Sequence, residues 1–296
     1  MKNFFAKIGL SVLAVMLMVS SVFAGNFVVG VEYSNVEQDL ETVYPILNEK
    51  VLQISDYYVN LEITENIKDI NLIEELVILG YKINDNFTPY ILLGNGNLSF
   101  NQEYMAIIKR NHAGIELDTS ESFLLAESDF KENDLMYGAG ISGDLYKFEN
   151  GIKFSYDANV RFMEINNEAL WSYIPYYDYD SELHKVNTDV EYRKISGNLI
   201  VSKEFVINKK EEVTVSPILN SITPFIGVQV SQVDLNIVNT VNNGDEEIIK
   251  TEQNSDAVLT SAILGAEVKI KDNWLLKVNA LVGDEKGYTA KVSYLF

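Results

Sequence analysis

The feature that most constrains this chain is the alternation of apolar and polar residues in many of its segments. In "GIKFSYDANVRF" (151–162) the even-numbered residues are apolar or aromatic, whereas the odd-numbered ones from Lys153 to Arg161 are polar or charged. Side chains of a strand point alternately to its two faces, so this pattern predicts a strand with one apolar face. Such strands occur both in soluble β-sandwiches and in transmembrane β-barrels.

The connections between these segments separate the two alternatives. Four are very short and rich in the Asn, Asp and Gly that tight hairpins favour: "INDN" at 83–86, "ENG" at 149–151, "KDN" at 271–273 and "GDEKG" at 283–287. Long polar stretches at 35–70, 101–133, 168–185 and 237–254 alternate with the first three. Short turns at one end and long loops at the other are typical of a transmembrane barrel.

We therefore predict an all-β fold, a transmembrane antiparallel up-and-down β-barrel of about ten strands, with eight or twelve as alternatives. The strands are expected near 26–34, 72–83, 87–99, 135–148, 151–165, 187–203, 221–236, 256–270, 274–282 and 288–296. The apolar segments 51–64 and 103–110 leave the count open. They give twelve strands if they cross the membrane, and ten if they extend loop hairpins or form short helices.

The first 24 residues have the features of a secretory signal peptide. "MKNFFAK" supplies a basic start, "IGLSVLAVMLMV" an apolar run and "SSVFA" a small-residue ending. The apolar run of about twelve residues is shorter than the roughly 20 that a membrane-spanning helix needs. We expect residues 1–24 to be removed on export and residues 25–296 to form the barrel.

The composition argues against several classes of protein. The formal net charge is −20, and no Lys/Arg cluster exceeds the short "KEFVINKK", so a nucleic-acid partner is not expected. Because the chain has no cysteine, a disulfide framework and a thiolate metal site are excluded. Beyond the signal peptide no run approaches 18 apolar residues, which argues against helical spans. We expect no cofactor and no bound metal.

One face of the predicted strands carries no charge. In 274–282 this face consists of Trp274, Leu276, Val278, Ala280 and Val282. A charge directed at the middle of a bilayer costs about 2–4 kcal/mol, so we expect this face to contact lipid. Aromatic residues gather toward strand ends, which predicts girdles at the two membrane interfaces.

The opposite face carries charges of both signs, which a barrel would direct into its lumen. They are Glu32, Lys82, Asp144, Lys153, Asp157, Arg161, Glu191, Arg193, Glu267, Lys269, Lys277 and Lys291. Because an unpaired buried charge is costly, we predict a lumen crossed by ion pairs. In 187–203 the apolar residues change parity, which predicts a β-bulge near Arg193 and Lys194.

The chain resembles the small bacterial outer-membrane β-barrels of the porin-like and opacity-protein-like superfamily. The resemblance rests on the signal peptide, the ten alternating segments, the short turns facing long loops, and the terminal "VSYLF". It implies an outer membrane of the Gram-negative type, with the long loops outside and both termini in the periplasm. The terminal pattern, Val292, Tyr294 and Phe296, is similar to the signal by which this class reaches the barrel-assembly machinery.

This resemblance implies location and architecture more than activity. The function it favours is that of a non-enzymatic structural protein or a narrow porin-like channel. Because side chains largely fill a barrel of eight to ten strands, a wide channel is not implied. Outer-membrane lipid is the expected partner, and small solutes or a surface ligand are further candidates.

The two histidines, His112 and His184, raise a catalytic alternative. Ten-stranded proteases of the omptin type use acidic residues and a histidine on their extracellular rim, and His184 lies near Asp178, Asp180 and Glu182. A lipid hydrolase would need a serine, a histidine and an orienting acid, and His112 precedes Ser120 and Ser122. An acidic loop contains such His–Asp neighbours by chance, and solvated loop histidines explain both positions better than catalysis does, so we expect no catalytic residues.

The segment 168–185 is the most distinctive surface loop. It contains the aromatic and acidic residues Trp171, Tyr173, Tyr176, Tyr177, Asp178, Tyr179 and Asp180. Aromatic residues of this kind are enriched where proteins bind partners, which makes the loop a candidate adhesin or ligand-binding surface. The alternative is an aromatic girdle that continues into an acidic rim.

Overall fold

A computed structural model describes residues 26–40, 42–54, 57–112, 115–172, 183–207, 219–243, 246–270 and 273–296. For those that fall within 42–66, 102–129, 168–186 and 241–251, it describes the backbone alone. The expected signal peptide 1–24 lies outside the described residues. In the described parts of the chain, no helix is long and apolar enough to cross a membrane.

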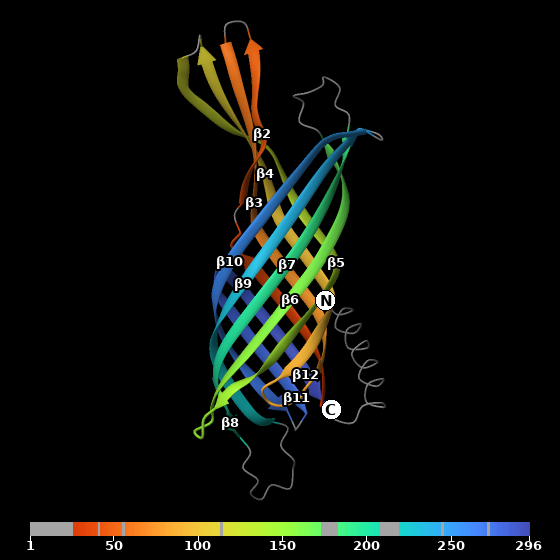
Figure 1. Ribbon diagram of the computed structural model, residues 1–296, viewed down its shortest axis with the longest axis vertical. Helices are drawn as coiled ribbons and strands as arrows, with labels where there is room; N and C mark the ends of the chain where they lie inside the picture. The colour runs from red at the N-terminus through yellow and green to blue at the C-terminus, as the bar shows by residue number, and fades with distance from the viewer. Residues whose placement is uncertain are drawn as a thin grey trace, which may run out of the picture.

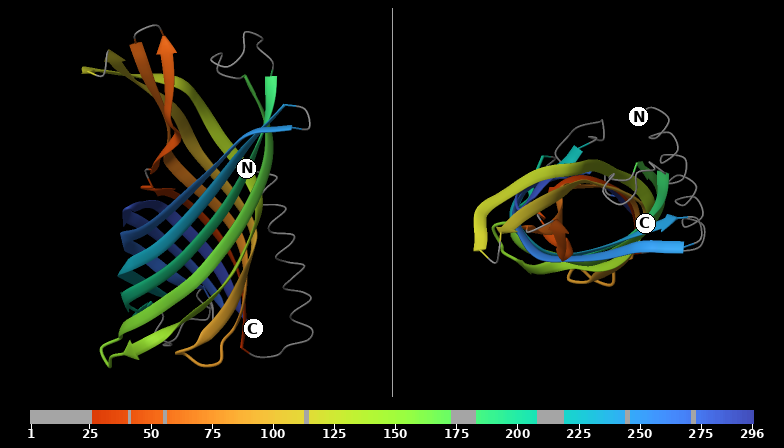
Figure 2. Two further views of the ribbon diagram at one scale, coloured as in Figure 1. Left: turned by 45° about the horizontal axis from the view of Figure 1, so that its top comes forward. Right: turned by 90° about the horizontal axis from the view of Figure 1, so that it is seen from above.

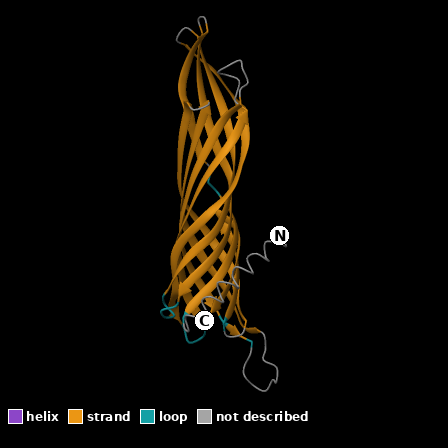
Figure 3. Ribbon diagram, turned by 90° about the vertical axis from the view of Figure 1, so that its right-hand side faces the viewer, coloured by secondary structure: helices purple, strands orange, loops and turns teal. Residues whose placement is uncertain are grey.

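Twelve strands make up the described structure (Figures 1 and 3). They are β1 (Phe27–Gln38), β2 (Thr42–Ile54), β3 (Tyr57–Tyr81), β4 (Thr88–His112), β5 (Ile115–Lys147), β6 (Ile152–Ser172), β7 (Leu183–Lys203), β8 (Phe205–Val206), β9 (Leu219–Asn243), β10 (Glu246–Ile270), β11 (Trp274–Gly283) and β12 (Glu285–Leu295).

Ten of these strands close into a barrel in which every neighbouring pair is antiparallel. The ring runs β1, β12, β11, β10, β9, β7, β6, β5, β4 and β3, and returns to β1. Figure 2 shows the closed ring from above. The up-and-down order and the count of ten confirm the predicted fold class.

The seam of the barrel joins the first and the last strand. Register pairs run from Val28 opposite Leu295 to Gln38 opposite Glu285, and Phe296 donates its backbone N–H to the carbonyl of Phe27 at 2.9 Å. Because β1 also pairs with β3, both of its edges are hydrogen-bonded. Closure of this kind leaves no free edge in the ring.

The strands are much longer than the sequence pattern predicts. The segments 35–70, 101–133, 168–185 and 237–254, expected to be long loops, consist of strand for most of their described length. The segments 51–64 and 103–110 extend hairpins rather than adding strands to the ring: β2 pairs only with β3, and the far part of β4 pairs with β3 and β5. The count of ten therefore stands, but the loop boundaries are wrong.

The two ends of the barrel differ. At the end where β1 begins and β12 ends, here called the terminal end, short turns join β3 to β4, β5 to β6 and β10 to β11. At the other, here called the hairpin end, β2, β3, β4 and β5 rise above the rest of the wall (Figure 1). The short strand β8 pairs with Ser221 and Ile222 of β9 at the terminal end.

Candidate functional site

The outer wall of the barrel changes from apolar to polar part-way along each long strand. On β9 the outward side chains Ile226, Val228 and Val230 are exposed, and the outward residues that follow are Gln232 and Asp234. A soluble protein rarely exposes so large an apolar surface. The apolar part of the wall therefore has the character of a lipid-contacting belt, and the polar part that of a water-facing surface.

The inner face of the same strand changes in the opposite sense. Beside the belt it carries the polar Gln229 and Ser231, and beyond the belt the buried Val233, Leu235 and Ile237. Within the belt the outside of the barrel is apolar, as in transmembrane barrels, and the inside carries polar groups together with a small apolar cluster of Val36, Ile200, Phe225, Ile263 and Leu281. Above the belt it is polar outside and apolar inside, as soluble proteins are.

Strand β7 makes the same change and corrects two sequence predictions. Its pairings with β6 and β9 run without a register shift, so the predicted bulge near Arg193 and Lys194 is wrong. Arg193 lies on the outer surface, where it pairs with Asp234, and Glu191 is exposed two residues away. Neither is a lumen charge, because the apolar residues change face where the strand leaves the belt.

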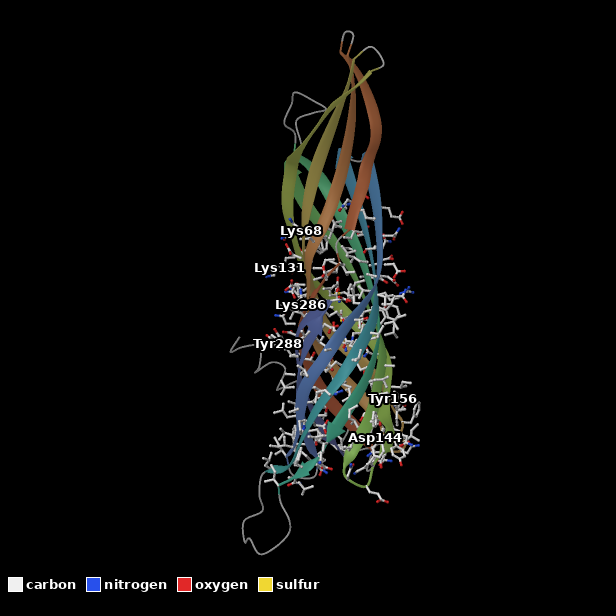
Figure 4. All side chains as sticks on the ribbon, turned by 90° about the vertical axis from the view of Figure 1, so that its left-hand side faces the viewer. Lys68, Lys131, Asp144, Tyr156, Lys286 and Tyr288 are labelled. Carbon is white, nitrogen blue, oxygen red and sulfur yellow. The ribbon has the colours of Figure 1, made fainter. Side chains whose placement is uncertain are left out.

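Aromatic side chains border the belt at both ends. At the terminal end, Trp274 packs edge-on against Tyr294 with ring centroids 5.0 Å apart, and Tyr294 packs against Phe296 at 4.7 Å. At the hairpin end, the rings of Tyr33 and Tyr288 lie 6.0 Å apart. Figure 4 shows Tyr288 with Lys286, Lys131 and Lys68 in succession above it. These positions fit girdles at two interfaces.

The belt has the height of a membrane. On β6 it extends from Phe154 to Phe162, about nine residues, and a tilted transmembrane strand needs about 9–11. The five even-numbered residues of this stretch, which point outward, are those of the apolar face of "GIKFSYDANVRF".

Above the belt, buried apolar side chains from most strands of the ring form one cluster inside the barrel. Its members include Ile70, Leu72, Leu98, Phe100, Phe130, Met136, Met163, Ile165, Val190, Tyr192, Val233, Leu235, Ile237 and Leu259. The rings of Phe100 and Phe130 stack with centroids 4.5 Å apart. Strands on opposite sides of the ring contribute to the cluster, so it fills this section of the lumen.

Below the apolar cluster, ion pairs cross the lumen. Arg161 of β6 donates to Glu32 of β1 at 2.9 Å and also pairs with Glu74 of β3. Ser34 donates a hydrogen bond of 2.5 Å to the same carboxylate of Glu74. Glu74 was not among the predicted lumen charges, although it shares the inward face of its strand with Leu72 and Leu76.

A second cross-lumen group centres on Glu285, which is fully buried. Its carboxylate pairs with Lys194 of β7 and accepts hydrogen bonds from Gln229, from Ser231 at 2.8 Å and from Gln38 at 3.3 Å. Gln38 also donates to the hydroxyl of Tyr192 on the opposite wall at 2.8 Å. These bonds tie β1 and β12 to β7 and β9 across the interior.

The surroundings of Glu285 determine its ionisation. Burial raises the pKa of its carboxyl, but the charge of Lys194 and the hydrogen bonds from Lys194, Gln229 and Ser231 outweigh burial and lower the pKa below its usual value. Glu285 lies three residues beyond Tyr288, above the belt. The carboxylate is therefore held in its charged form.

The remaining predicted lumen charges lie toward the terminal end. Lys153 pairs with Asp144 at 3.1 Å, and Lys82 pairs with Asp85 of the adjoining turn at 2.7 Å. Asp157 accepts hydrogen bonds from Tyr90 at 2.9 Å and from Asn159 at 3.1 Å. Lys82, Asp144, Lys153, Asp157, Glu267, Lys277 and Lys291 line one cavity of about 320 Å³, here called the vestibule, and Lys269 lies on the inward face of β10 beyond Glu267.

Most of the predicted loop site lies outside the described residues. This holds for Tyr173, Tyr176, Tyr177, Asp178, Tyr179 and Asp180. The backbone places Trp171 opposite His184 in the β6–β7 hairpin and His112 opposite Ile115 in the β4–β5 hairpin, so the two histidines belong to different hairpins. Among the described side chains, no three His, Asp or Glu residues are grouped so as to hold a metal ion.

Comparisons with known proteins return similarities of fold at low sequence identity. No family model and no curated protein sequence matches the chain. Among solved structures, the outer membrane protease OmpT from Escherichia coli is 9% identical over 92% of this chain and 97% of that chain, with a TM-score of 0.44. The chain's own topology is a closed, antiparallel, up-and-down ring of ten strands.

Two other solved structures also match the chain over most of its length. The beta domain of the Bordetella autotransporter BrkA is 9% identical over 92% of this chain and 100% of that chain, with a TM-score of 0.37. The toluene transporter TbuX of Ralstonia pickettii is 7% identical over 93% and 90%, with a TM-score of 0.28. At these values the matches say nothing about activity.

Proposed function

We propose that this chain is a non-enzymatic outer-membrane protein whose barrel is closed to solutes and which presents β-hairpins at the cell surface. Its terminal end would face the periplasm and its hairpin end the exterior. Outer-membrane lipid would contact the belt. Val292, Tyr294 and Phe296, which lie on the outward face of β12, would serve as the signal read by the barrel-assembly machinery.

The observation that carries the proposal is the filling of the lumen at two successive levels. The apolar cluster fills the section above the belt, and the groups around Arg161 and Glu285 cross the section next to it. The cavity in this polar layer holds only about 90 Å³, room for a few water molecules. A structural role is thus better supported than a porin-like one.

Planar-bilayer recording tests this proposal. Refolded protein that shows heat-modifiable gel mobility should insert without producing discrete conductance steps, because the described side chains of the apolar cluster and of the polar layer fill the lumen. The same preparation, boiled before addition, controls for leakage caused by detergent. Large and stable steps from the folded protein alone would contradict the closed lumen and favour a porin.

A surface-binding role through the segment 168–185 is a second candidate, and the place of this segment at the hairpin end, where β6 ends and β7 begins, favours it. Loops and hairpins that project from a rigid scaffold often carry binding sites. Removing residues 173–182 should reduce the adherence of expressing cells to solid surfaces or to other cells, while heat-modifiable mobility is kept. Removal of 208–218, which lies between β8 and β9 in the sequence, is the matched control. Equal adherence in both variants would exclude the loop as the binding surface.

A further inference from the structure

The vestibule is a cavity inside the barrel that takes no part in closing the lumen. It lies inside the terminal half of the barrel and extends to the rim, where Lys82 and Asp85 stand at the β3–β4 turn. Its volume of about 320 Å³ is at the lower end of the range for small-molecule sites. Figure 4 shows Asp144 near this end of the molecule.

Two lysines on neighbouring strands face this cavity side by side. Lys277 of β11 and Lys291 of β12 are directly opposite each other in the register, and both line the vestibule. Like charges opposite each other across a strand pair destabilise a sheet. Such a pair is expected only where another interaction compensates for the repulsion.

The lysines rest against aromatic rings rather than against carboxylates. The Nζ atom of Lys277 lies 4.9 Å from the ring centroid of Phe225, and that of Lys291 lies 5.6 Å from the ring centroid of Tyr90. A cation over an aromatic face is attracted to it but keeps its full charge. The rings therefore hold the two ammonium groups in place without neutralising them.

The carboxylates of the vestibule are mostly engaged elsewhere. Asp144 pairs with Lys153 and Asp85 with Lys82, and Glu32, which lies opposite Lys291 in the register but does not line the vestibule, pairs with Arg161. Two carboxylates are left near the lysines: Asp157, which accepts hydrogen bonds from Tyr90 and Asn159, and Glu267, the register partner of Lys277. Among the side chains that the structure describes, no carboxylate oxygen lies within 4.0 Å of the Nζ atom of Lys277 or Lys291.

We propose that the vestibule binds a small anion through a carboxylate or phosphate group placed between Lys277 and Lys291. One oxyanion group can accept hydrogen bonds from both ammonium groups, and it removes the repulsion between them. The cavity admits a compound of metabolite size and excludes a polymer. The anion enters from the terminal end, because the apolar cluster closes the other.

Titration calorimetry on the refolded barrel in a zwitterionic detergent tests this site. Inorganic phosphate and succinate are the probes, one for each class of oxyanion. At least one should bind saturably with one site per chain. The Lys277→Met and Lys291→Met variants should each bind it at least tenfold more weakly, whereas Lys286→Met, which removes an exposed lysine outside the vestibule, should bind like the parent protein.

Two controls keep the outcome decisive. Heat-modifiable mobility shows that each variant is folded, and Lys277→Arg keeps the charge, so it should retain binding within a few-fold even if the methionine variant fails to fold. Absence of saturable binding of both probes to the parent protein, or equal binding in the Lys277→Met and Lys286→Met variants, would overturn the proposal. Neither result bears on the conductance test of the closed lumen.

Discussion

Glu285 shows how much one lumen side chain contributes to the barrel. It is fully buried, pairs with Lys194 and accepts hydrogen bonds from Gln38, Gln229 and Ser231. Replacing a buried ion pair by apolar residues is often tolerated, but removing one partner leaves the other charge uncompensated. The pair is therefore expected to matter most when it is broken on one side only.

Glu285→Gln should lower the free energy of unfolding by about 3–5 kcal/mol, the usual cost of leaving a buried partner charge unpaired. Urea unfolding in lipid vesicles measures this change. The double variant Glu285→Gln with Lys194→Met should recover part of the loss, and Glu252→Gln, at an exposed position of β10, should change little. A loss in the Glu252 variant as large as that in the Glu285 variant would contradict the role given to the pair.

The same carboxylate makes the stability depend on pH. Its pKa is lowered in the folded barrel, so its contribution is fully present above the unfolded value of about 4.3 and is lost as the pH falls through the folded value. The difference in unfolding free energy between the parent and Glu285→Gln should be constant near neutral pH and shrink below about pH 4. A difference that stays unchanged to pH 3 would show that Glu285 is not ionised in the fold.

For single residues, the sequence predicts which charged side chains point into the lumen better than it predicts their ion-pair partners. The strand parity of "GIKFSYDANVRF" identifies Arg161 as an inward charge, but its partners Glu32 and Glu74 come from strands more than 80 residues away. Lys194 is not predicted as a lumen charge, because the bulge predicted near Arg193 and Lys194 changes which side chains point inward. Glu285 is not predicted as a lumen charge, because the pattern "GDEKG" predicts a turn, whereas β12 begins at Glu285.

Strand β7 shows why the pattern of one element can mislead. A change in the parity of apolar residues arises from a bulge in a uniform environment, or from a regular strand that passes from lipid into water. Ile195 and Leu199 point outward, and Val190 and Tyr192 point inward, on a strand without a register shift. The polar residues decide between the two explanations. Asp189, Glu191 and Arg193 have the same odd numbering as Ile195 and Leu199, so all five point outward on a regular strand, and the strand passes from lipid into water without a bulge.

Paired substitutions on β7 test where the belt ends. Leu199→Arg places a charge in the belt and should cost about 2–4 kcal/mol in vesicles. Glu191→Arg lies above the belt opposite Glu164, so it should leave stability unchanged or raise it slightly. Vesicle unfolding in urea compares the two variants. Equal costs would mean that both positions meet the same medium.

For the whole molecule, the short turns and the alternation are enough to predict a ten-stranded ring and its seam. They do not predict the height of the wall, because the outward faces of the extensions are polar and their segments read as loops. The upper part of the barrel follows the rules of a soluble protein with an apolar core. The lower part follows those of a membrane barrel, and both occur along the same strands.

A single-cysteine scan along the outward face of β9 tests this division most directly. The chain has no native cysteine, so each variant carries one reactive thiol. In vesicles, a water-soluble maleimide should leave Ile226→Cys, Val228→Cys and Val230→Cys unlabelled and should label Gln232→Cys, Asp234→Cys and Asn236→Cys, with a step at one position. Uniform labelling along the strand, or a step at any other position, would contradict the account.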